Sequence, residues 1–417
     1  MKTPFVQQTV NIGFSRSDLE NYLIELGYWD TPEKKERHAY VLSPSAYILS
    51  ASQNKELQNI ARLTYQAVQN LEDYLSILAH QKHLLRHEYS FLRMARSASH
   101  GLYKPGEDKD TRIPPLVKID LVQQQGGEYQ VVEIDTYNPR ALGTILLTER
   151  TLSLVGRKPP YSLAKGLASL LRSAGINSTW VLPVSQHEGY YETSYSMIAS
   201  TLASYGISLP LMREKDAAQD LSILDTKNSR QFFIIPQSLN RYPTVRDTLV
   251  RRYQSGNSNL FYPPKAYLGS KSFLPFLASQ EGMKKYIPAT VLLNEDSDSD
   301  VLSCFTLNGK KACLKATTSS GAKGVLFSDL DQESFTSTLE ENKDARTPLW
   351  ILQEQVDQEQ IAISIFGEDD TQLTRDFFVR LTLYVDLNGI VGLKMTARTS
   401  PLVHGAADCV QLPVILG

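Results

Sequence analysis

The sequence predicts an α+β protein in which a helical N-terminal region is followed by antiparallel strands and an α/β unit. Apolar residues recur at helical spacing through residues 1–110, which indicates amphipathic helices. Strand-like and helical segments alternate through residues 151–260, a pattern typical of parallel strands covered by helices. Alternating segments joined by turn-forming pairs lie on either side of this unit and predict antiparallel hairpins.

Two helices account for most of the N-terminal region. Ser15 or Ser17 can cap the first helix and Gly27 can end it, around an apolar stripe of Leu19, Tyr22, Leu23 and Leu26. The second helix is longer, and its stripe is typical of core packing. That stripe consists of Leu57, Ile60, Ala61, Val68, Leu71, Leu75 and Leu78.

A polar segment rich in turn formers follows these helices. It can form an anion-binding loop, because guanidinium groups and hydroxyls match carboxylate or phosphate oxygens. The favoured interpretation is a solvated helix end with scattered basic residues, because basic clusters of this size are common on surfaces. The residues concerned lie in the 93–104 loop and are Arg93, Arg96, Ser97, Ser99 and His100.

The segments KIDLV and YQVVEID flank a GGE turn and predict a β-hairpin. Strand alternation can place Asp120, Glu133 and Asp135 on one face of this hairpin. Such carboxylates repel one another unless a cation lies between them, and Mg²⁺ prefers oxygen ligands of this kind. The hairpin therefore predicts a metal–phosphate site, with solvated outward-facing carboxylates as the alternative.

The middle of the chain predicts parallel strands covered by helices. Strands are expected at 179–184, 207–212 and 231–236, with helices at 194–206 and 245–253. Neither GxGxxG nor GxxxxGK[ST] follows these strands, which disfavours a Rossmann cofactor site and a Walker-type phosphate loop.

The second half of the chain predicts further hairpins around a basic loop. Asn308-Gly309 joins two strands within 303–316, and Asn388-Gly389 joins two strands within 377–398. Lys315 ends the first of these hairpins and the small-residue loop 317–324 follows it. A lysine charge next to closely approaching backbone N–H groups suits phosphate binding.

The strand at 349–357 ends in acidic and amide residues. Its edge at Glu354 to Val356 can offer a carbonyl and an N–H to an adenine base, and Asp357 or Glu359 can accept hydrogen bonds from ribose hydroxyls. Arg380 and Arg398 on the last hairpin suit a triphosphate or an acyl phosphate, with structural ion pairs as the alternative.

The order of these motifs resembles the ATP-grasp superfamily, specifically its circularly permuted, glutathionylspermidine-synthase-like members. VVEIDTYNP resembles the Glu-x-Asn-(x)3-Pro signature of the permuted family, with Pro139 in place, and it precedes the phosphate lysines instead of following them. GSKSFL with Lys271, KATTSSGAKG with Lys315 and the hinge QEQV come later. The match covers about residues 112–148 and 260–400, and Asp135 stands where the family commonly has Asn.

The resemblance implies roles for particular residues. Mg²⁺ would be held by Asp120, Glu133 and Asp135. The nucleotide would contact Lys271, Lys315, Ser319, Ser320, Gly321, Gly324, Glu354, Gln355, Val356 and Glu359. Catalysis would rest on Arg398, Lys315 and Arg380, with Arg398 on the acyl-phosphate oxyanion. Asn138 and Arg140 are candidates for contact with the acceptor substrate, and His404 is expected to be a loop or core residue beside Arg398.

The implied organisation is a circularly permuted ATP-grasp fold with a pre-ATP-grasp-like α/β domain. Residues 1–110 form the helical N-terminal region, 111–150 the acidic metal-binding strands, and 151–260 the α/β domain. Residues 261–360 form the smaller lobe with the lysine, the glycine-rich loop and the adenine hinge, and 361–417 complete the core.

The resemblance implies an ATP- and Mg²⁺-dependent carboxylate–amine ligase that acts on small-molecule or peptide substrates through an acyl phosphate. A kinase acting on another group and a non-catalytic nucleotide-binding regulatory protein are the alternatives. The net charge of -2 gives no basic field for nucleic acid, and the absence of a long apolar run or leader pattern favours a cytoplasmic protein without a membrane segment. The sequence indicates no oligomeric state.

The three cysteines, Cys304, Cys313 and Cys409, lack the spacing of a zinc site and are too few for a disulfide framework. We expect buried thiols, with a catalytic cysteine as the less favoured alternative.

Overall fold

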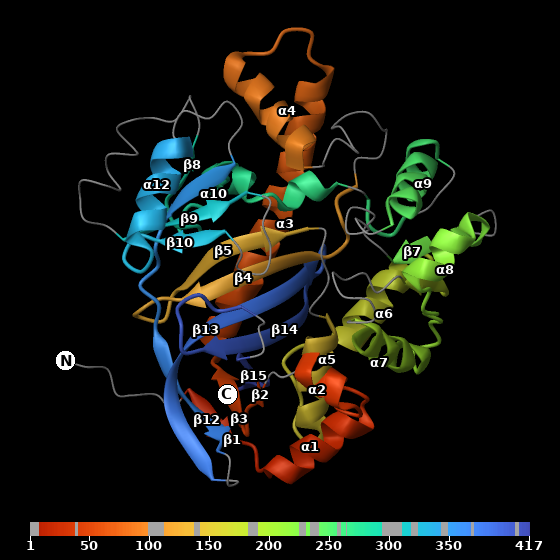
Figure 1. Ribbon diagram of the computed structural model, residues 1–417, viewed down its shortest axis with the longest axis vertical. Coiled ribbons are helices and arrows are strands. Elements are labelled where there is room, and N and C mark those ends of the chain that lie inside the picture. Colours follow the sequence, from red (N-terminus) through yellow and green to blue (C-terminus); the bar gives the residue numbers. More distant parts are fainter. Residues whose placement is uncertain are drawn as a thin grey trace.

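The computed structural model describes residues 8–37, 41–98, 112–136, 142–181, 191–224, 231–233, 242–256, 260–263, 265–293, 311–317, 324–342, 349–367, 371–404 and 408–417. Helices and several antiparallel sheets occur together, which confirms the predicted α+β class (Figure 1). Within these residues, no helix is both long enough and apolar enough to cross a membrane.

The described residues of the N-terminal third form four helices and five strands. These elements are β1 (Thr9–Asn11), α1 (Arg16–Glu25), α2 (Pro32–Arg37), β2 (Val41–Leu42), β3 (Ser45–Leu49), α3 (Ala51–His80), α4 (Arg86–Ala98), β4 (Val117–Gln123) and β5 (Tyr129–Asp135). The central third comprises α5 (Leu142–Leu154), α6 (Leu163–Ser173), β6 (Thr179–Val181), α7 (Glu192–Ala203), α8 (Glu214–Gln219), η1 (Leu221–Leu224), β7 (Gln231–Phe233) and α9 (Pro243–Gln254).

The last third supplies a second group of strands. It comprises η3 (Ala266–Gly269), η4 (Lys271–Phe273), α10 (Leu274–Ser279), β8 (Thr290–Leu293), β9 (Ala312–Ala316), β10 (Val325–Phe327), α12 (Gln332–Asn342), β11 (Trp350–Glu354), β12 (Gln360–Phe366), β13 (Gln372–Asp386), β14 (Gly389–Arg398), β15 (Val410–Leu412) and β16 (Val414–Leu416).

The largest sheet has seven strands in the order β2-β15-β14-β13-β4-β5, and β12 pairs with another part of β13. Two of the three predicted hairpins are present in this sheet, β4 with β5 and β13 with β14, each antiparallel. Gly389 has a φ of +125°, so the second turn needs a residue without a side chain. The acidic hairpin thus lies beside the final hairpin through the pairing of β4 with β13, although more than 200 residues separate them.

The second sheet has four antiparallel strands in the order β10-β9-β11-β8. Strand β9 was predicted to pair with residues 303–307 through Asn308-Gly309, but that strand and its turn lie outside the described residues. Instead, β9 bonds along one edge to β10 and along the other to β11. The partners of β9 therefore follow it in the chain.

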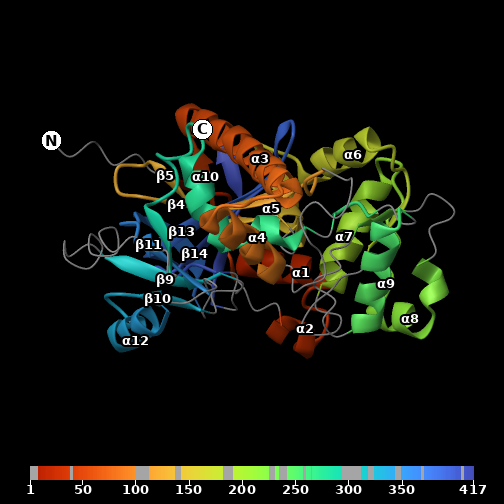
Figure 2. The ribbon, with the colours of Figure 1, turned by 90° about the horizontal axis from the view of Figure 1, so that it is seen from above.

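The predicted parallel pairing in the middle of the chain is confirmed. Strands β6 and β7 pair in parallel, and single parallel bridges join the β6 segment to Ser208 and Leu211. The predicted strands are described only as far as Val181 and Phe233. Helices α6 to α9 gather around this unit, on the side of the molecule away from β8–β11 and α12 (Figure 2).

The two predicted N-terminal helices are confirmed, with one difference after them. Ser15 caps α1 in a capping box with Asp18, and Gly27 follows the helix with a φ of +74°. The predicted basic loop begins instead as helix α4, which continues to Ala98 because its residues around Met94 pack into the core. Three short strands that were not predicted also lie in this region. Strand β1 pairs with β3, β2 pairs with β15, and β3 also pairs with β16. Because β15 and β16 come from the C-terminal end of the chain, these pairings form only in the folded protein.

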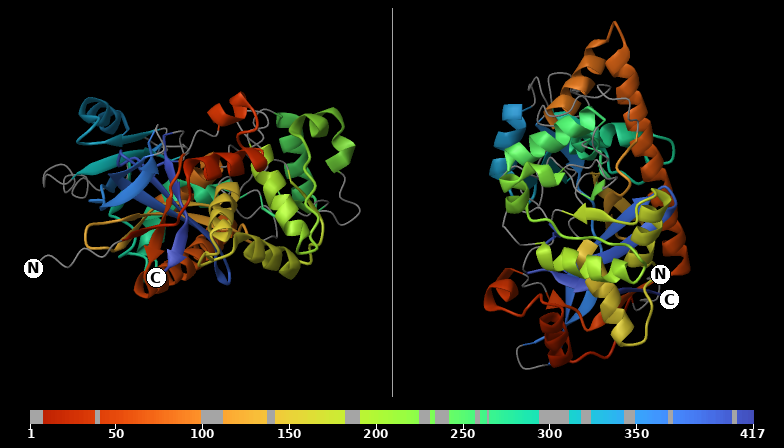
Figure 3. Two further views of the ribbon diagram at one scale, coloured as in Figure 1. Left: turned by 90° about the horizontal axis from the view of Figure 1, so that it is seen from below. Right: turned by 90° about the vertical axis from the view of Figure 1, so that its right-hand side faces the viewer.

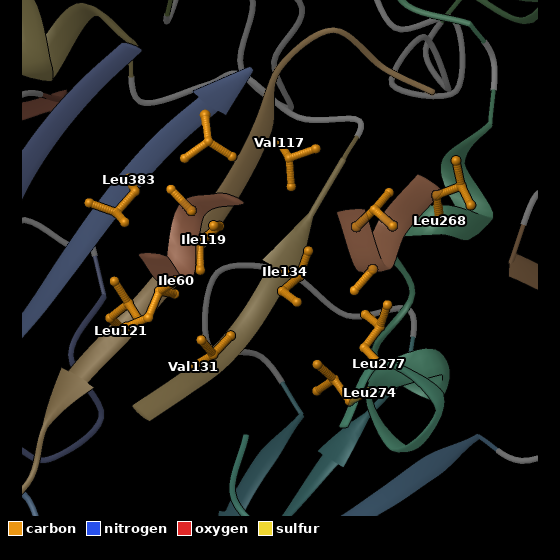
Figure 4. Close-up of a cluster of buried hydrophobic side chains, with 14 of the residues drawn as sticks. Ile60, Val117, Ile119, Leu121, Val131, Ile134, Leu268, Leu274, Leu277 and Leu383 are labelled. Atoms are coloured by element: carbon orange, nitrogen blue, oxygen red, sulfur yellow. The ribbon is translucent and has the colours of Figure 1, made fainter. Parts of the chain in front are cut away.

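Helix α3 packs against one face of the large sheet. Ile60 lies with Ile119, Leu121 and Leu383 in a hydrophobic cluster, and all four side chains are fully buried (Figure 4). Because successive strand side chains point to opposite faces, this arrangement directs Lys118 and Asp120 to the other face. Figure 3 shows α3 along one side of the molecule, so the polar face of the sheet remains for the functional site.

Candidate functional site

A cavity of about 100 Å³ lies between the polar face of the large sheet and the four-stranded sheet. The large sheet contributes Asp120, Val122, Val132, Glu133 and Arg380 to its wall. The small sheet contributes Cys313, Lys315, Val325, Phe327 and Gln353, and the wall is completed by Lys271, residues 354–356, Gln358 and residues 401–404. Segments that are far apart in the sequence, including most of the predicted site, are thus brought together.

Lys315 links the two sheets. It projects from β9, is 8% exposed, and donates to the carbonyl oxygen of Val132 on β5 at 3.0 Å and to Oε1 of Gln353 on β11 at 2.5 Å. None of these acceptors is a carboxylate. The ammonium group therefore brings a positive charge to the cavity without an anion bonded to it in these contacts.

Lys271 reaches the cavity from a short helical turn. Ser270 caps this turn, and the Lys271 backbone N–H donates to the carbonyl of Thr317 at 3.3 Å, next to the predicted phosphate loop. Its Nζ lies 3.1 Å from Oε1 of Glu133. Burial raises the pKa of Glu133, but Lys271 and Lys118 outweigh it and hold that pKa below its usual value. Glu133 is therefore ionised at neutral pH.

Asp120 is a buried, paired carboxylate. It is 1% exposed, and its Oδ2 lies 2.9 Å from Nζ of Lys118 and 3.5 Å from Nη1 of Arg380. The hydroxyl of Thr382 donates to Oδ1 at 2.7 Å. Burial raises the pKa of Asp120, but Arg380 and Lys118 together lower it well below its usual value. The alternative that Asp120 is a solvated surface carboxylate is wrong.

The three predicted metal ligands do not assemble a metal site on their own. Within the part of the chain that the structure describes, no group of three His, Cys, Asp or Glu side chains is placed to hold a metal ion. Asp120 faces Lys118 and Arg380, Glu133 faces Lys271, and Asp135 is opposite Lys118 in the β4–β5 register. Alternation could have revealed Lys118 from the sequence, because it lies two residues before Asp120 on the same face.

The predicted hinge forms part of the cavity wall. Glu354, Gln355 and Val356 line both this cavity and an adjoining wider one of about 650 Å³. The backbone N–H groups of Glu354 and Gln355 donate to carbonyls of Ala289 and Lys311 at 2.8 and 2.9 Å. A base bound at this edge would therefore take its N–H donor from Val356.

The two ribose candidates are placed differently. Asp357 lines the wider cavity, whereas Glu359 lines neither cavity. Gln8 donates to Oε1 of Glu359 at 3.4 Å, and the charge of Glu359 raises the pKa values of the buried Tyr47 and Tyr129 after the larger effect of burial. The structure thus brings Asp357, and not Glu359, towards the predicted nucleotide.

Of the two predicted arginines, Arg380 lines the cavity directly and Arg398 supports its wall. Arg398 donates to Oδ2 of Asp408 from Nε at 2.9 Å and from Nη2 at 2.6 Å, and to the Leu402 carbonyl at 3.0 Å. Its Nη1 also contacts Nε2 of His404 at 2.6 Å, so that nitrogen accepts and carries no proton. Burial, and then Arg398, lower the pKa of His404, which therefore stays neutral.

Lys394 was not predicted. It lies on β14 opposite Thr382, is 4% exposed, and donates to Oε1 of Gln411 at 3.5 Å. Burial and the nearby charge of Arg380 lower its pKa to about 8. The period of two along KMTAR places Lys394 and Arg398 on one face, a signal that the sequence contained.

Several predicted residues lie outside the described part of the chain. They are Ser319, Ser320 and Gly321 of the phosphate loop, Asn138 and Arg140 after the acidic strand, Ser99 and His100 of the 93–104 segment, and Cys304. Gly324 is described and has a φ of +71° directly before β10. Cys313 and Cys409 are buried free thiols, as predicted.

Among known proteins, similarity to this chain is found only at the level of solved structures. No protein-family model matches the chain, and no curated protein matches it. Among solved structures, it is similar to "Crystal structure of D-cycloserine synthetase DcsG", at 13% sequence identity and a TM-score of 0.30, over 52% of this chain and 90% of that one. A likeness at this score does not establish a shared fold.

Proposed function

We propose that the cavity binds ATP and that the protein is an ATP-dependent carboxylate–amine ligase with a circularly permuted ATP-grasp core. The proposal is supported by the order of the motifs in the sequence and by the place where they meet. Lys271, Lys315 and the hinge residues 354–356 line one cavity between the seven-stranded sheet and the antiparallel four-stranded sheet. A nucleotide bound there would have its base at the hinge and its phosphates at the lysines.

The observation that carries this proposal is the charge of the cavity region. Lys118, Lys271, Lys315, Arg380 and Lys394 stand against Asp120, Glu133, Asp135 and Glu354, a formal surplus of one positive charge on buried or half-buried groups. Burial of positive groups without matching anions is costly unless a ligand supplies the negative charge. A polyphosphate supplies such charge, and basic groups in a cleft with little water bind it strongly.

The cavity wall combines apolar and basic side chains. Phe327, Val325 and Leu402 are apolar surfaces that can enclose a base. Lys315 is held by neutral oxygens of Gln353 and Val132, so it can turn to a phosphate without leaving a buried carboxylate unpaired.

In the proposed reaction, an oxygen of the substrate carboxylate attacks the γ-phosphorus and ADP leaves with the electrons of the broken P–O bond. The amine then attacks the acyl carbon, and inorganic phosphate leaves as the amine loses a proton. The protein contributes position and charge, with Lys271, Lys315 and Arg380 facing the oxygens that become more negative. No protein nucleophile is required, and burial raises the pKa of the Cys313 thiol in the cavity wall.

The described carboxylates do not fit a metal held by the protein alone, so no step is assigned to such an ion. The second candidate is a non-catalytic nucleotide-binding protein. Turnover separates the two candidates, and the chemistry of the acceptor separates a ligase from a kinase.

The test is ADP release from ATP, with magnesium salt in the buffer, in the presence of hydroxylamine and a panel of amino acids, peptides and other carboxylic acids. A ligase forms a hydroxamate with at least one acid, because hydroxylamine traps the acyl phosphate. Lys315→Met should lower ATP affinity measured by calorimetry by roughly 10–100-fold, since a charge-assisted contact is lost. The exposed Lys165→Met is the matched control and should bind ATP as the wild type does.

ATP binding without ADP release for any acid would contradict the ligase and leave the regulatory candidate. ADP release with a phosphorylated product other than an acyl phosphate would indicate a kinase. Equal ATP affinity for Lys315→Met and wild type would contradict the site itself.

A further inference from the structure

Lys118 lies among the carboxylates of the acidic hairpin. Its Nζ is 2.9 Å from Oδ2 of Asp120. In the register of β4 and β5, Lys118 is opposite Asp135 and Asp120 is opposite Glu133, so all four side chains belong to one patch of the polar face. The ammonium group therefore lies where the charges of the carboxylates converge.

The electrostatic surroundings of Lys118 agree with this position. Burial lowers its pKa, but Asp120, Glu133 and Asp135 outweigh burial and raise the pKa above its usual value. Lys118 is therefore firmly charged at neutral pH, and its charge is stabilised by the same oxygens that the sequence assigns to Mg²⁺.

Other protein groups also contact two of these carboxylates, Asp120 and Glu133. Arg380 lies 3.5 Å from Oδ2 of Asp120, and the Thr382 hydroxyl donates to Oδ1. Lys271 lies 3.1 Å from Oε1 of Glu133. A free divalent ion entering here would have to displace these positive groups, and each displaced group would lose its partner in a buried site, which is costly.

We propose that Lys118 is a built-in counter-ion that takes the position of a divalent cation between the acidic strands, so that the protein alone holds no metal there. Any Mg²⁺ then arrives with a polyphosphate. The charge balance explains why: three basic groups, Lys118, Arg380 and Lys271, face three carboxylates, and no net negative charge remains to attract a free cation. The inference concerns the protein without nucleotide and does not depend on the ligase reaction.

Titration with Mn²⁺ alone, followed by electron paramagnetic resonance of the free ion, tests this inference without nucleotide or turnover. Wild-type protein should leave Mn²⁺ free. Lys118→Met removes the ammonium but keeps an unbranched side chain, and it should bind Mn²⁺ roughly 10–100-fold more tightly than wild type, the range over which neighbouring groups tune metal affinity.

Two further variants identify the group responsible. Lys118→Arg keeps the charge and should leave Mn²⁺ free, as in wild type. Adding Asp120→Asn to Lys118→Met should remove the new binding, because it removes a carboxylate that would ligate the ion. Circular dichroism of each variant confirms that it is folded.

Tight Mn²⁺ binding by the wild-type protein would overturn the proposal, and this measurement requires no variant. A folded Lys118→Met protein that leaves Mn²⁺ free would also overturn it, because Lys118 would then not hold the cation position. Neither outcome bears on ATP binding, which calorimetry measures separately. The inference and the proposed function can therefore fail independently.

Discussion

At the scale of single residues, the buried carboxylates of the cavity are neutralised by neighbouring basic side chains. Asp120 has two basic partners and a hydroxyl donor, and Glu133 has Lys271. Lys394 differs because its bond to Gln411 is to a neutral oxygen, and its pKa falls to about 8 through burial and the charge of Arg380. Buried ionisable groups with a shifted pKa, such as Lys394, are typical of functional sites.

Glu149 gives a residue-scale prediction away from the cavity. It is 8% exposed on α5, its Oε1 accepts the backbone N–H of Leu163 at 2.8 Å, and burial raises its pKa to about 8. The folded protein keeps this carboxyl protonated, whereas the unfolded chain releases the proton above its usual pKa of 4.5. The free energy of unfolding therefore falls as pH rises from about 4.5 to 8.

Glu149→Gln should remove this loss, because glutamine keeps the acceptor and cannot ionise. We expect equal stability of variant and wild type near pH 4.5, and an advantage of the variant on the order of 3 kcal/mol by pH 7. Urea unfolding at several pH values measures the difference. If the difference in free energy of unfolding between variant and wild type did not change with pH, Glu149 would have the same pKa in the folded and unfolded states, which would contradict the prediction.

At the scale of elements, close contacts between helices and strands position the polar face of the large sheet. Helices α5 and α6 lie beside β14, where Ile145 and Leu163 approach Gly392. Helix α5 also meets α7 at Gly143, where a Cβ atom would lie 2.3 Å from Cβ and 2.9 Å from Cα of Ser194. The glycine is needed here for space and not for its φ angle.

Gly143→Ala should destabilise the protein by about 1–3 kcal/mol through overpacking. In a helix without such a contact, replacing glycine by alanine stabilises by about 1 kcal/mol. The sign of the change in the free energy of unfolding therefore tests whether the close contact with Ser194 is present. The urea midpoint measures it. Adding Ser194→Gly should recover part of the loss, because the Cβ and Oγ atoms of Ser194 are among the closest neighbours. A higher midpoint for Gly143→Ala alone would show that the helices separate easily.

The elements were largely predictable, because their signals are local. The capping box at Ser15, the apolar stripe of α3 and the Asn388-Gly389 turn each lie within a few residues of the structure they specify. Helix α4 was missed because its polar composition suggested a loop, whereas burial around Met94 keeps it helical. The partners of β9 could not be read from Asn308-Gly309, because β10 and β11 come later in the chain.

At the scale of the whole molecule, helix α3 connects the two sides of the cavity. It packs beneath the large sheet, and its Glu72 reaches the segment that leads to Lys271. Oε1 of Glu72 lies 2.6 Å from Nζ of Lys265, and its Oε2 accepts a hydrogen bond from the Tyr267 hydroxyl at 2.6 Å. Glu72 is 3% exposed and Lys265 is fully buried, so this ion pair is part of the core.

Glu72→Gln should lower the free energy of unfolding by about 3–5 kcal/mol, because it removes the negative charge that faces the buried Lys265 ammonium group. We also expect weaker ATP binding, since the η3–η4 segment positions Lys271. Chemical denaturation and calorimetry measure the two effects. The matched control is Asp73→Asn at the next, exposed position of α3, with an expected change within about 0.5 kcal/mol. Equal effects of both variants would contradict this role of the pair.

The sequence alone determined the α+β class, the main helices, both hairpins of the large sheet and the identity of eight of the residues that line the cavity. These features follow from periodicity, caps and turn residues, which act over short distances along the chain. The sequence also predicted a metal site, because it shows that Asp120, Glu133 and Asp135 can share one face but not which side chains lie opposite them.

Only the tertiary structure decided which charges meet. It placed Lys118 and Arg380 on Asp120, Lys271 on Glu133, and Glu359 away from the cavity. The reason is physical: the energy of a buried charge depends on partners within a few ångströms, and strands from residues 117–135 and 372–398 supply those partners only after they pair. Local patterns specify which side chains can share a face, and packing decides which of them neutralise one another.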